Sequence, residues 1–444
     1  MVAPSTLAVL LILLSDLEIG STTKPNIIIV TVDDLGWADV GFHGLRQIPV
    51  PNINALAADG IILNKYYALP WPIRSRIGLL TGIYPYRTGV TRVLLPCQPV
   101  ALPEVFRLMP AFFKTLGYQT HFVGMWNLGF YKERFTPASR DFDTAYAKWA
   151  GPGDYWTHDI ETKMQGFDLR LNSDPMWNHS GVYSTRLFTQ RAVHLFSQSA
   201  PNTMFLLALR QPLLLILSHQ ALHTANYHGG LQCPLEHLDT FSYIGDRKRS
   251  VFAGALTEVD QSLGQMFKAL HDRGLLKNTI LVFASASGGM PVGDFTNNLS
   301  FNYPLRGTKG TYFEGGIRVP AFIWSPLLNK TRRVSDQMMH VTDWLPTLFA
   351  AAGGDSKNLG AVLDLDSVNM WDALSGDLKS PRTEIIHNID LARHTFALQV
   401  GRYKCIAVRK DIDAVICRSA WYPVPEDQCG FPPGDNVHGI AYKV

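Results

Sequence analysis

The feature that most constrains the fold is the apolar run NIIIVTV at Asn26–Val32, which Asp33-Asp34-Leu35-Gly36 follows at once. The run does not alternate apolar and polar residues, so it predicts a strand buried on both faces at the centre of a covered sheet. In open α/β sheets, ligand-binding groups gather at the carboxyl ends of the strands. Asp33 and Asp34 are therefore the first candidates for a functional site.

Strand-like and helix-like segments alternate along the rest of the chain. Apolar spacing and terminal glycines predict helices over Pro51–Gly60, Ser250–Gly274 and His340–Gly354, a helix and then a turn over Arg76–Pro85, a helix and then a strand over Pro110–Trp126, and a buried strand leading into a glycine turn over Thr279–Gly289. This alternation predicts the α/β class. After about Gly376 the pattern changes to short strand-like pieces, which predicts a small C-terminal subdomain over residues 376–444.

The composition excludes several classes of protein. With 46% hydrophobic and 17% charged residues, the chain is too apolar to be disordered. Its formal net charge is only +3 and no basic run concentrates it, so no nucleic-acid partner is expected. The five cysteines form no C-x-x-C pair, which argues against a structural zinc site. Because five is odd, at least one thiol stays unpaired within a monomer.

The N-terminus predicts entry into the secretory pathway. The apolar run LAVLLILL at residues 7–14, with small residues at 20 and 21, matches a signal peptide over residues 1–21; the alternative is a buried N-terminal strand. No later segment predicts a membrane span, since the most apolar one, residues 204–217, is interrupted by RQP. Candidate glycosylation sequons begin at Asn178, Asn298 and Asn329. We therefore expect a lysosomal or extracellular protein.

A near repeat interrupts the α/β pattern. MFLLALRQ at residues 204–211 is followed, after one residue, by the similar LLLILSHQ at residues 213–220. Both copies have the composition of one buried strand. Two interpretations stay open: an extra strand or hairpin, or a tandem duplication or gene-prediction error.

Several motifs in order resemble the sulfatase family, and within it most resemble arylsulfatase B. They include IIIVTVDDLGWADVGFHG, VPNINALAADGIILNKYYALP, LLTGIYPYRTGV, PLRGTKGTYFEGGIRVPAFIWSPLL and HVTDWLPTLFAAAGG. The resemblance extends from about Asn26 to Asp390, while the last fifty or so residues match poorly. It implies a sulfatase domain over residues 24–375 and an alkaline-phosphatase-like fold: a large mixed β-sheet flanked by helices, with a small C-terminal antiparallel-sheet subdomain.

The resemblance also implies a chemistry, the hydrolysis of sulfate esters. In the family the nucleophile is a formylglycine hydrate made from the cysteine of a C-x-P-S-R motif. A calcium ion, held by a D-D pair and a later D-N pair, polarises the nucleophile and the sulfate, because developing negative charge is best met by cations placed in advance. Calcium prefers six to eight oxygen ligands, so four residue ligands are about the minimum share for the protein.

This sequence departs from that pattern at the metal and nucleophile positions. Asp33 and Asp34 match the first metal pair, but the D-N pair is replaced by Ala286 and Ser287. The nucleophile position is Pro72, which has no thiol to convert and no hydroxyl to ionise. Calcium, implied by the resemblance, is therefore predicted to bind weakly or not at all.

The positions that contact sulfate are partly kept. Arg76, His223 and Lys309 match the family, whereas its motif lysine and histidine are replaced by Met125 and Asn127. Without an ion, Asp33 and Asp34 would be neighbouring like charges, so we expect Arg76 and Lys309 to pair with them directly; the alternative is a wet pocket without such pairs.

Two functions remain open at this stage. The first is a sulfatase-family protein that has lost turnover. The second is an active arylsulfatase that hydrolyses sulfate esters of glycosaminoglycan sugars, with a sequence error at the site. In either case a sulfated sugar or glycosaminoglycan is the expected partner.

Overall fold

The computed structural model describes residues 24–90, 94–96, 98–161, 165–198, 211–226, 229–291, 297–357, 359, 364–391, 395–409 and 437–443. The predicted signal peptide, the first copy of the near repeat up to residue 210, and Cys97 lie outside the described residues. The second copy forms strand β10 (Leu213–Ser218). In the described part of the chain, no helix combines the length and the apolar character that crossing a bilayer requires.

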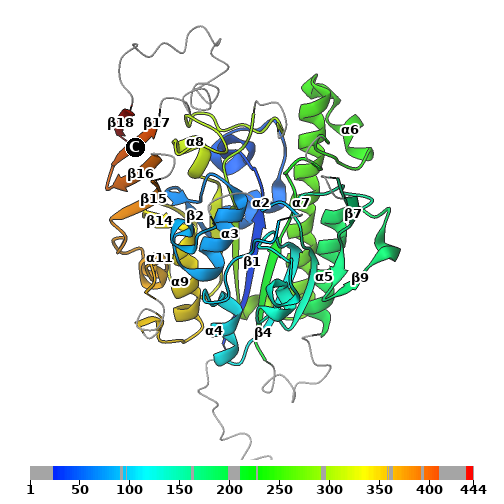
Figure 1. The fold of residues 1–444 in the computed structure, drawn as a ribbon, viewed down its shortest axis with the longest axis horizontal. Coiled ribbons are helices and arrows are strands. Elements are labelled where there is room, and N and C mark those ends of the chain that lie inside the picture. Colours follow the sequence, from blue (N-terminus) through cyan, green and yellow to red (C-terminus); the bar gives the residue numbers. More distant parts are fainter. Residues whose placement is uncertain are drawn as a thin grey trace, which may run out of the picture.

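A ten-stranded mixed sheet forms the centre of the molecule, in the order β13-β2-β12-β11-β1-β10-β4-β5-β8-β9 (Figure 1). Its strands are β1 (Asn26–Val32), β2 (Ile61–Leu63), β4 (Gln119–Met125), β5 (Thr144–Lys148), β8 (Arg170–Leu171), β9 (Asp174–Pro175), β10, β11 (Thr279–Ser285), β12 (Ala321–Trp324) and β13 (Arg333–Ser335). Strand β1 runs parallel to β10 on one side and to β11 on the other, while β12 is antiparallel to β11. Every residue of β1 is buried, as its sequence predicts.

Strand β1 contributes side chains to two hydrophobic cores, one on each face of the sheet. Ile27 and Ile29 pack with residues of helices α3 (Pro72–Thr81), α4 (Met109–Thr115) and α9 (Trp344–Ala351). Ile28 and Val30 pack on the other face with residues of α2 (Pro51–Asp59), α5 (Ser184–Gln198) and α7 (Arg247–Asp272). Because successive side chains of a strand point to opposite faces, an all-apolar strand needs helices on both sides. The predicted α/β class with a flanked mixed sheet is confirmed.

The C-terminal segment forms a second sheet, which is antiparallel and has the order β15-β16-β17-β18. Its strands are β15 (Glu384–Asp390), β16 (Thr395–Val400), β17 (Tyr403–Arg409) and β18 (Val437–Lys443). It lies beside the large sheet, at the left of Figure 1, after α11 (Trp371–Gly376). The remaining elements are short: β3 (Tyr66–Tyr67) with β14 (Met339–His340), β6 (Asp159–Glu161) with β7 (Gln165–Phe167), α6 (Glu236–Thr240) and α8 (Glu314–Ile317).

Several predicted helix starts are wrong: α7 begins three residues before Ser250, and α9 begins at Trp344, after His340 has ended strand β14. The helix expected over Arg76–Pro85 begins four residues earlier, at Pro72, and ends at Thr81 before Gly82, which has a φ of 68°. Proline is favoured at the first helical position, because its missing N–H would have no helical partner there. The shift places Pro72, which the resemblance aligns with the nucleophile position, on the first residue of helix α3.

Two cysteines fall within the described residues, Cys233 and Cys405, and neither forms a disulfide there. Cys233 is buried, and burial raises the pKa of its thiol to about 11. Its reactivity is therefore low, since the thiolate is the reactive form.

Candidate active site

The carboxyl ends of the central strands bring the predicted site residues together. Asp33 and Asp34 follow β1, Ser287 follows β11, and Asn127 comes two residues after β4. His223 lies in the turn after β10. Because β1, β4, β10 and β11 are parallel neighbours, these residues reach the same edge of the sheet. The edge that the sequence indicates is thus where the candidate residues lie.

Asp33 is bound by an arginine from helix α3. Arg76 places its Nη2 at 2.7 Å and 2.9 Å from the two carboxylate oxygens of Asp33, and its Nε donates to Ser218 Oγ. The side chains of Asp33 and Arg76 are 0% and 4% exposed. Burial raises the pKa of Asp33 to about 6 against the charge of Arg76, and the neighbouring charge of Asp34 acts in the same direction as burial.

Asp34 is bound by a lysine. Lys309 Nζ lies 2.5 Å from Asp34 Oδ2, and Ser287 Oγ donates to Asp34 Oδ1 over 2.8 Å. Burial alone would raise the pKa of Asp34, but the charge of Lys309, with His223 and the hydrogen bonds of Lys309 and Ser287, holds it below its ordinary value. The expected pairing of Arg76 and Lys309 with the two aspartates is therefore confirmed.

His223 presents a neutral ring to the site. Its Nδ1 donates to the carbonyl oxygen of Thr224 over 2.9 Å, and its Nε2 lies 3.8 Å from Asp34 Oδ2. Burial lowers the pKa of His223 to about 4, and the charge of Lys309 adds to this effect. With the proton on Nδ1, the Nε2 atom is an acceptor.

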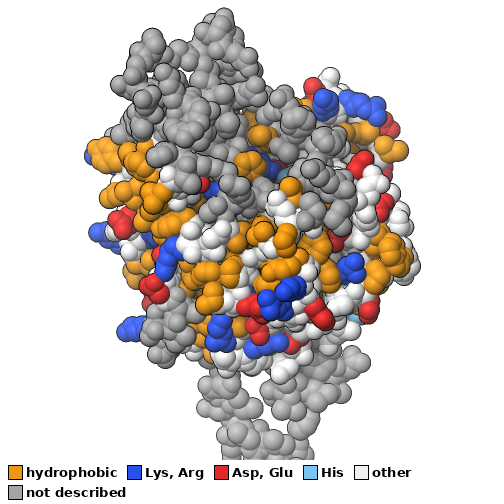
Figure 2. Space-filling view, in the orientation of Figure 1, with side chains coloured by type: hydrophobic (Ala, Val, Ile, Leu, Met, Phe, Trp, Pro, Cys, Tyr) orange, Lys and Arg blue, Asp and Glu red, His pale blue; other side chains and the backbone are white. Residues whose placement is uncertain are grey.

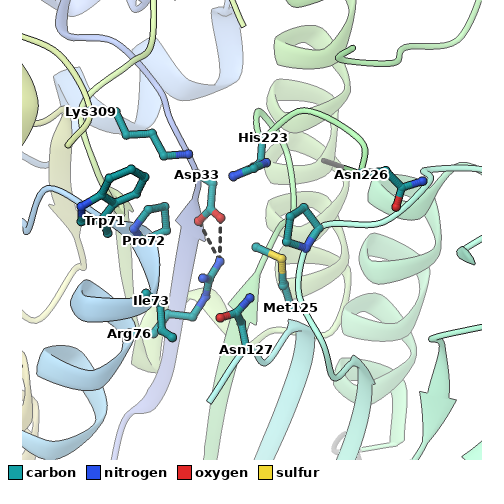
Figure 3. Close-up of a pocket in the computed structure, with 11 residues that line it drawn as sticks. Asp33, Trp71, Pro72, Ile73, Arg76, Met125, Asn127, His223, Asn226 and Lys309 are labelled. Carbon is teal, nitrogen blue, oxygen red and sulfur yellow. Dashed lines mark hydrogen bonds and ion pairs between the residues drawn. The ribbon is translucent and has the colours of Figure 1, made fainter. Parts of the chain in front are cut away.

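A pocket with a volume of about 110 Å³ lies over these residues (Figure 3). Its floor is formed by buried side chains, among them Met125 and Asn127 at 1% and 6% exposure. Around the mouth lie half-buried residues: Trp71, Pro152, His223 and Asn226. Pro72, the expected nucleophile position, lines the pocket too.

The residues present do not fit calcium. Ala286 offers no ligand atom, and the Ser287 hydroxyl is engaged with Asp34. Calcium takes six to eight oxygen ligands at 2.3–2.6 Å, whereas here an ammonium group lies at hydrogen-bond distance from Asp34 and a guanidinium group spans Asp33. Two carboxylates that already carry protein cations make a poor site for a dication.

The glycines that follow Ala286 and Ser287 are required by packing. A Cβ atom on Gly288 would lie 1.8 Å from the carbonyl oxygen of Gly315, and one on Gly289 would lie 1.9 Å from Ser300 Oγ. Both positions therefore need glycine for packing, whatever the chemistry. Ala286 and Ser287, by contrast, carry no such constraint beyond fitting a buried space.

The three sequons differ in exposure. Asn178 and Asn329 are exposed, so a glycan could be attached there in the folded chain. Asn298 is only 2% exposed, and its Nδ2 donates to the carbonyl oxygens of Asp34 and Leu222. Because the nitrogen that would carry the glycan is buried and donates two hydrogen bonds, Asn298 is withdrawn as a glycosylation candidate. It instead supports the backbone of the site.

Several site residues were missed in the sequence. Trp71, Pro152 and Asn226 line the pocket, and Ser218 and Asn298 hold the charged residues in place. The position of Trp71 directly before Pro72 was the only local signal for any of them. The others come from segments distant in sequence, and only the fold brings them here.

Comparison with known proteins places the chain among its relatives. Residues 25–354 match the family model described as Sulfatase. The chain is 36% identical to arylsulfatase J of Mus musculus over 84% of this chain and 59% of that protein. It is 28% identical to N-acetylgalactosamine-6-sulfatase of Mus musculus over 88% of this chain and 69% of that protein.

A solved structure supports the same assignment. Ps i-CgsB, in complex with k-i-k-neocarrahexaose, has a TM-score of 0.76 and 26% identity, covering 86% of this chain and 84% of that one. This chain spans about three fifths of the length of arylsulfatase J, so their similarity concerns the shared part. With motif order, fold and family model in agreement over most of the sequence, the chain belongs to the sulfatase family.

Proposed function

We propose that this chain is a sulfatase-family protein that does not hydrolyse sulfate esters. The observation that carries the proposal is the pairing of both aspartates with protein cations: Lys309 Nζ contacts Asp34 and Arg76 spans Asp33. A cation fixed by the chain neutralises the carboxylates, but it offers no open coordination position to a sulfate oxygen or a nucleophile.

The absence of a nucleophile at position 72 supports the proposal. Pro72 carries no atom that can be oxidised to an aldehyde or deprotonated. The nearest hydroxyl along the helix, Ser75 Oγ, is 2% exposed and accepts a hydrogen bond from the backbone N–H of Leu69. It does not line the pocket, so it is a poor substitute.

Proton transfer to a leaving oxygen is also unsupported. Asn127 stands at the position of the family histidine, and its amide cannot donate and regain a proton near neutral pH. Met125 stands at the position of the family lysine; it is buried in the pocket floor and carries no charge. His223 keeps its proton on Nδ1, turned to the backbone.

The second candidate is an active arylsulfatase whose sequence is in error at the site. The near repeat at residues 204–220 favours it, because a gene-prediction error in that segment would make further sequence errors at the site positions credible. Transcript sequencing across residues 70–76, 204–224 and 284–289 separates the two. A cysteine codon at position 72 together with a D-N pair at 286–287 would overturn the first proposal.

The direct test is turnover of an aryl sulfate by the purified protein. We expect a rate equal to that of buffer, an unmodified Pro72 in peptide mass spectrometry, and no stoichiometric calcium in elemental analysis. The matched variant restores five positions together: Pro72→Cys, Met125→Lys, Asn127→His, Ala286→Asp and Ser287→Asn. Pro72→Cys alone should stay inactive, because the ion and the sulfate contacts are still missing. Turnover by the wild-type protein well above buffer would refute the proposal.

Related proposals concern the substrate class and the destination of the chain. The resemblance to arylsulfatase B and the name of N-acetylgalactosamine-6-sulfatase both support sulfated amino sugars of glycosaminoglycans as the ancestral ligand class. The predicted leader and the exposed Asn178 and Asn329 support passage through the secretory pathway to the lysosome or the cell exterior. We retain the proposed division into residues 24–375 and 376–444.

A further inference from the structure

The charges in the floor of the pocket cancel. Asp33 is matched by Arg76 and Asp34 by Lys309, each pair in direct contact and each side chain at most 4% exposed. Of these four, Asp33, Arg76 and Lys309 line the pocket, and no further Asp, Glu, Lys or Arg does so among the described residues. A sulfate group placed here would lose its hydration without meeting an uncompensated cation, which is unfavourable for an ion.

Two polar atoms of the pocket lining are acceptors, beside the N–H donors of Arg76, Lys309 and Asn226. Asn127 Nδ2 donates to the carbonyl oxygen of Ala150, which leaves Asn127 Oδ1 buried and without a hydrogen-bond partner among the described residues. His223 Nε2 is likewise an acceptor, since Nδ1 carries the proton that Thr224 receives. Sulfate oxygens are acceptors as well, so they cannot satisfy either atom. A hydroxyl or an amide N–H can.

The remaining wall is apolar. Trp71, Pro72, Ile73, Met125 and Pro152 line the pocket, and Figure 3 shows Trp71 and Pro72 on one side and Met125 on the other. A half-buried tryptophan with a nearby hydrogen-bonding group suits a ligand that has both C–H surface and hydroxyls. Because a water molecule occupies about 30 Å³ of the liquid, a pocket of about 110 Å³ has room for one substituted edge of a sugar ring, with the rest at the mouth.

We propose that this pocket binds the uncharged, hydroxyl- or acetamido-bearing edge of a sugar in preference to a sulfated one. Its donor groups would bind Asn127 Oδ1 and His223 Nε2, and its C–H surface would pack against Trp71. The inference rests on the proposed loss of sulfate chemistry and adds a ligand class to it. In effect, the pocket recognises a sugar that has already lost its sulfate or never carried one.

The test compares N-acetylgalactosamine with its 6-sulfate by isothermal titration at neutral pH. We expect the uncharged sugar to bind at least about tenfold more tightly, a ratio that corresponds to about 1.4 kcal/mol. Saturation-transfer NMR should show the sugar in contact with tryptophan. Asn127→Gly removes the unpaired acceptor and suits the φ of 53° at this position, so it should weaken binding of the uncharged sugar.

Asn172→Gly is the matched control, because Asn172 also has a positive φ of 54° but its oxygen accepts from Ala145 N–H outside the pocket. It should leave binding unchanged. A second variant, Met125→Lys with Asn127→His, adds charge to the floor without touching the four paired residues. It should reverse the preference toward the 6-sulfate, and its melting temperature establishes that it folds.

The outcomes separate this inference from the proposed function. If the 6-sulfate binds more tightly but is not hydrolysed, the ligand inference is wrong and the loss of turnover stands. If the 6-sulfate binds more tightly and is hydrolysed, both are wrong. Binding of neither sugar at the highest soluble concentration also overturns the inference. Tighter binding of the uncharged sugar, lost in Asn127→Gly and kept in Asn172→Gly, supports it.

Discussion

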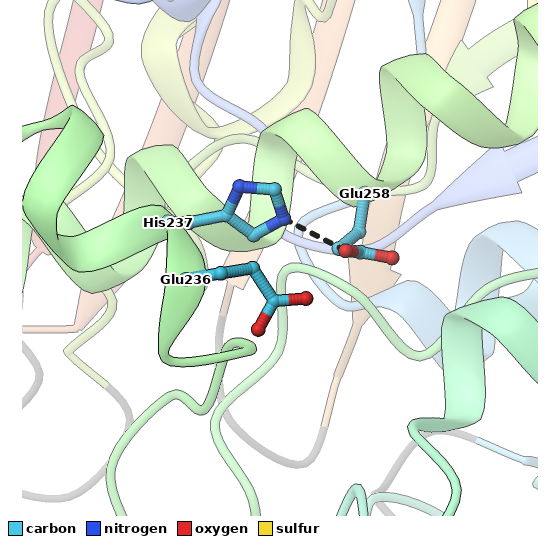
Figure 4. Close-up of side chains that lie close together, drawn as sticks. All are labelled: Glu236, His237 and Glu258. Carbon is cyan, nitrogen blue, oxygen red and sulfur yellow. Dashed lines mark hydrogen bonds and ion pairs between the residues drawn. The ribbon is translucent and has the colours of Figure 1, made fainter.

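Two clusters of acidic and basic side chains in this molecule invite comparison. In the pocket, Asp33 and Asp34 are paired one to one with Arg76 and Lys309, and all four are almost fully buried. The second cluster lies where α6, α7 and α5 meet (Figure 4): Glu236, His237 and Glu258 place ligand atoms within 4.8 Å of one another. There Arg186 bridges Glu236 and Glu258, and Glu236 remains 59% exposed.

The comparison shows that suitable ligand types do not define a metal site by themselves. In the pocket, Arg76 and Lys309 compensate the two aspartates, because a buried carboxylate cannot stay unpaired. The outer cluster has three potential ligands, yet water can solvate Glu236 and an arginine already neutralises part of its charge. Burial, rather than the number of carboxylates, determines how strongly each cluster depends on its cations.

Removing one cation from each cluster tests most directly whether the two clusters depend differently on their cations. Lys309→Met leaves Asp34 buried without its closest cation, and we expect the free energy of unfolding to fall by about 3–5 kcal/mol. Arg186→Met also affects a buried carboxylate, since Glu258 is 2% exposed, but His237 Nε2 still lies 2.7 Å from Glu258 Oε1 and Arg186 itself is 39% exposed. The expected fall is therefore smaller, about 1–2 kcal/mol. Urea denaturation measures both.

The double variant Asp34→Asn with Lys309→Met controls for lost packing. Asparagine tolerates the φ of 57° at position 34 and needs no cation, so the double variant should recover most of the stability lost in Lys309→Met. If the double variant is as unstable as the single one, the unpaired charge is not the cause.

The second prediction concerns pH. Because burial raises the pKa of Asp33 from 3.8 to about 6, the folded chain binds this proton more tightly than the unfolded chain does. The contribution of Asp33 to stability is therefore greatest below pH 3.8 and is lost as the pH rises through about 6. At 1.36 kcal/mol per pKa unit, the loss is about 3 kcal/mol over that window.

Asp33→Asn isolates this contribution. The difference in unfolding free energy between the wild-type protein and this variant should fall as the pH rises from 4 toward about 6. Glu236→Gln in the outer cluster should give the opposite sign: the hydrogen bond from Arg186 lowers the pKa of Glu236, so its stabilisation is present above its ordinary pKa and lost at lower pH. Equal slopes for both variants would contradict the assigned difference in burial.

A third prediction tests the support beneath the pocket. Asn298→Ala removes the two hydrogen bonds to the carbonyl oxygens of Asp34 and Leu222 and leaves those acceptors buried. We expect the free energy of unfolding to fall by about 1–3 kcal/mol. Asn178→Ala, at an exposed sequon in unglycosylated protein, should change it by less than about 0.5 kcal/mol. A fall of the same size in both would show that Asn298 has no special role.

The sequence predicted part of this site, for physical reasons that can be stated. An all-apolar strand followed by two aspartates fixes both the central strand and the edge at which its ligands lie. The resemblance to the family singled out Arg76 and Lys309, and electrostatics predicted their pairing, since two adjacent carboxylates without an ion require cations. These inferences needed only the identity and order of residues.

What the sequence could not predict depends on contacts between distant segments. The burial of Asn298 beneath Asp34 joins residues that are 264 positions apart, and nothing in the sequon shows that its nitrogen is covered. Similarly, the unpaired oxygen of Asn127 results from the place of Ala150 in the fold. The start of helix α3 at Pro72 was missed because a proline also ends helices, and its role depends on which side of it the helix lies.

The smallest expected effect is that of added calcium, and it decides whether either cluster takes up an ion. A ligand at 100 times its dissociation constant would stabilise the folded chain by about 2.7 kcal/mol, whereas we expect millimolar calcium to change the unfolding free energy by less than about 0.5 kcal/mol. If calcium does stabilise the protein, Asp34→Asn and Glu236→Gln locate the ion. Loss of the effect in Asp34→Asn alone would mean that the ion displaces Lys309, and the balance of charge on which both proposals rest would be wrong. Loss in Glu236→Gln alone would place the ion in the outer cluster and leave the pocket as described, because Arg186 is exposed enough to move aside into water.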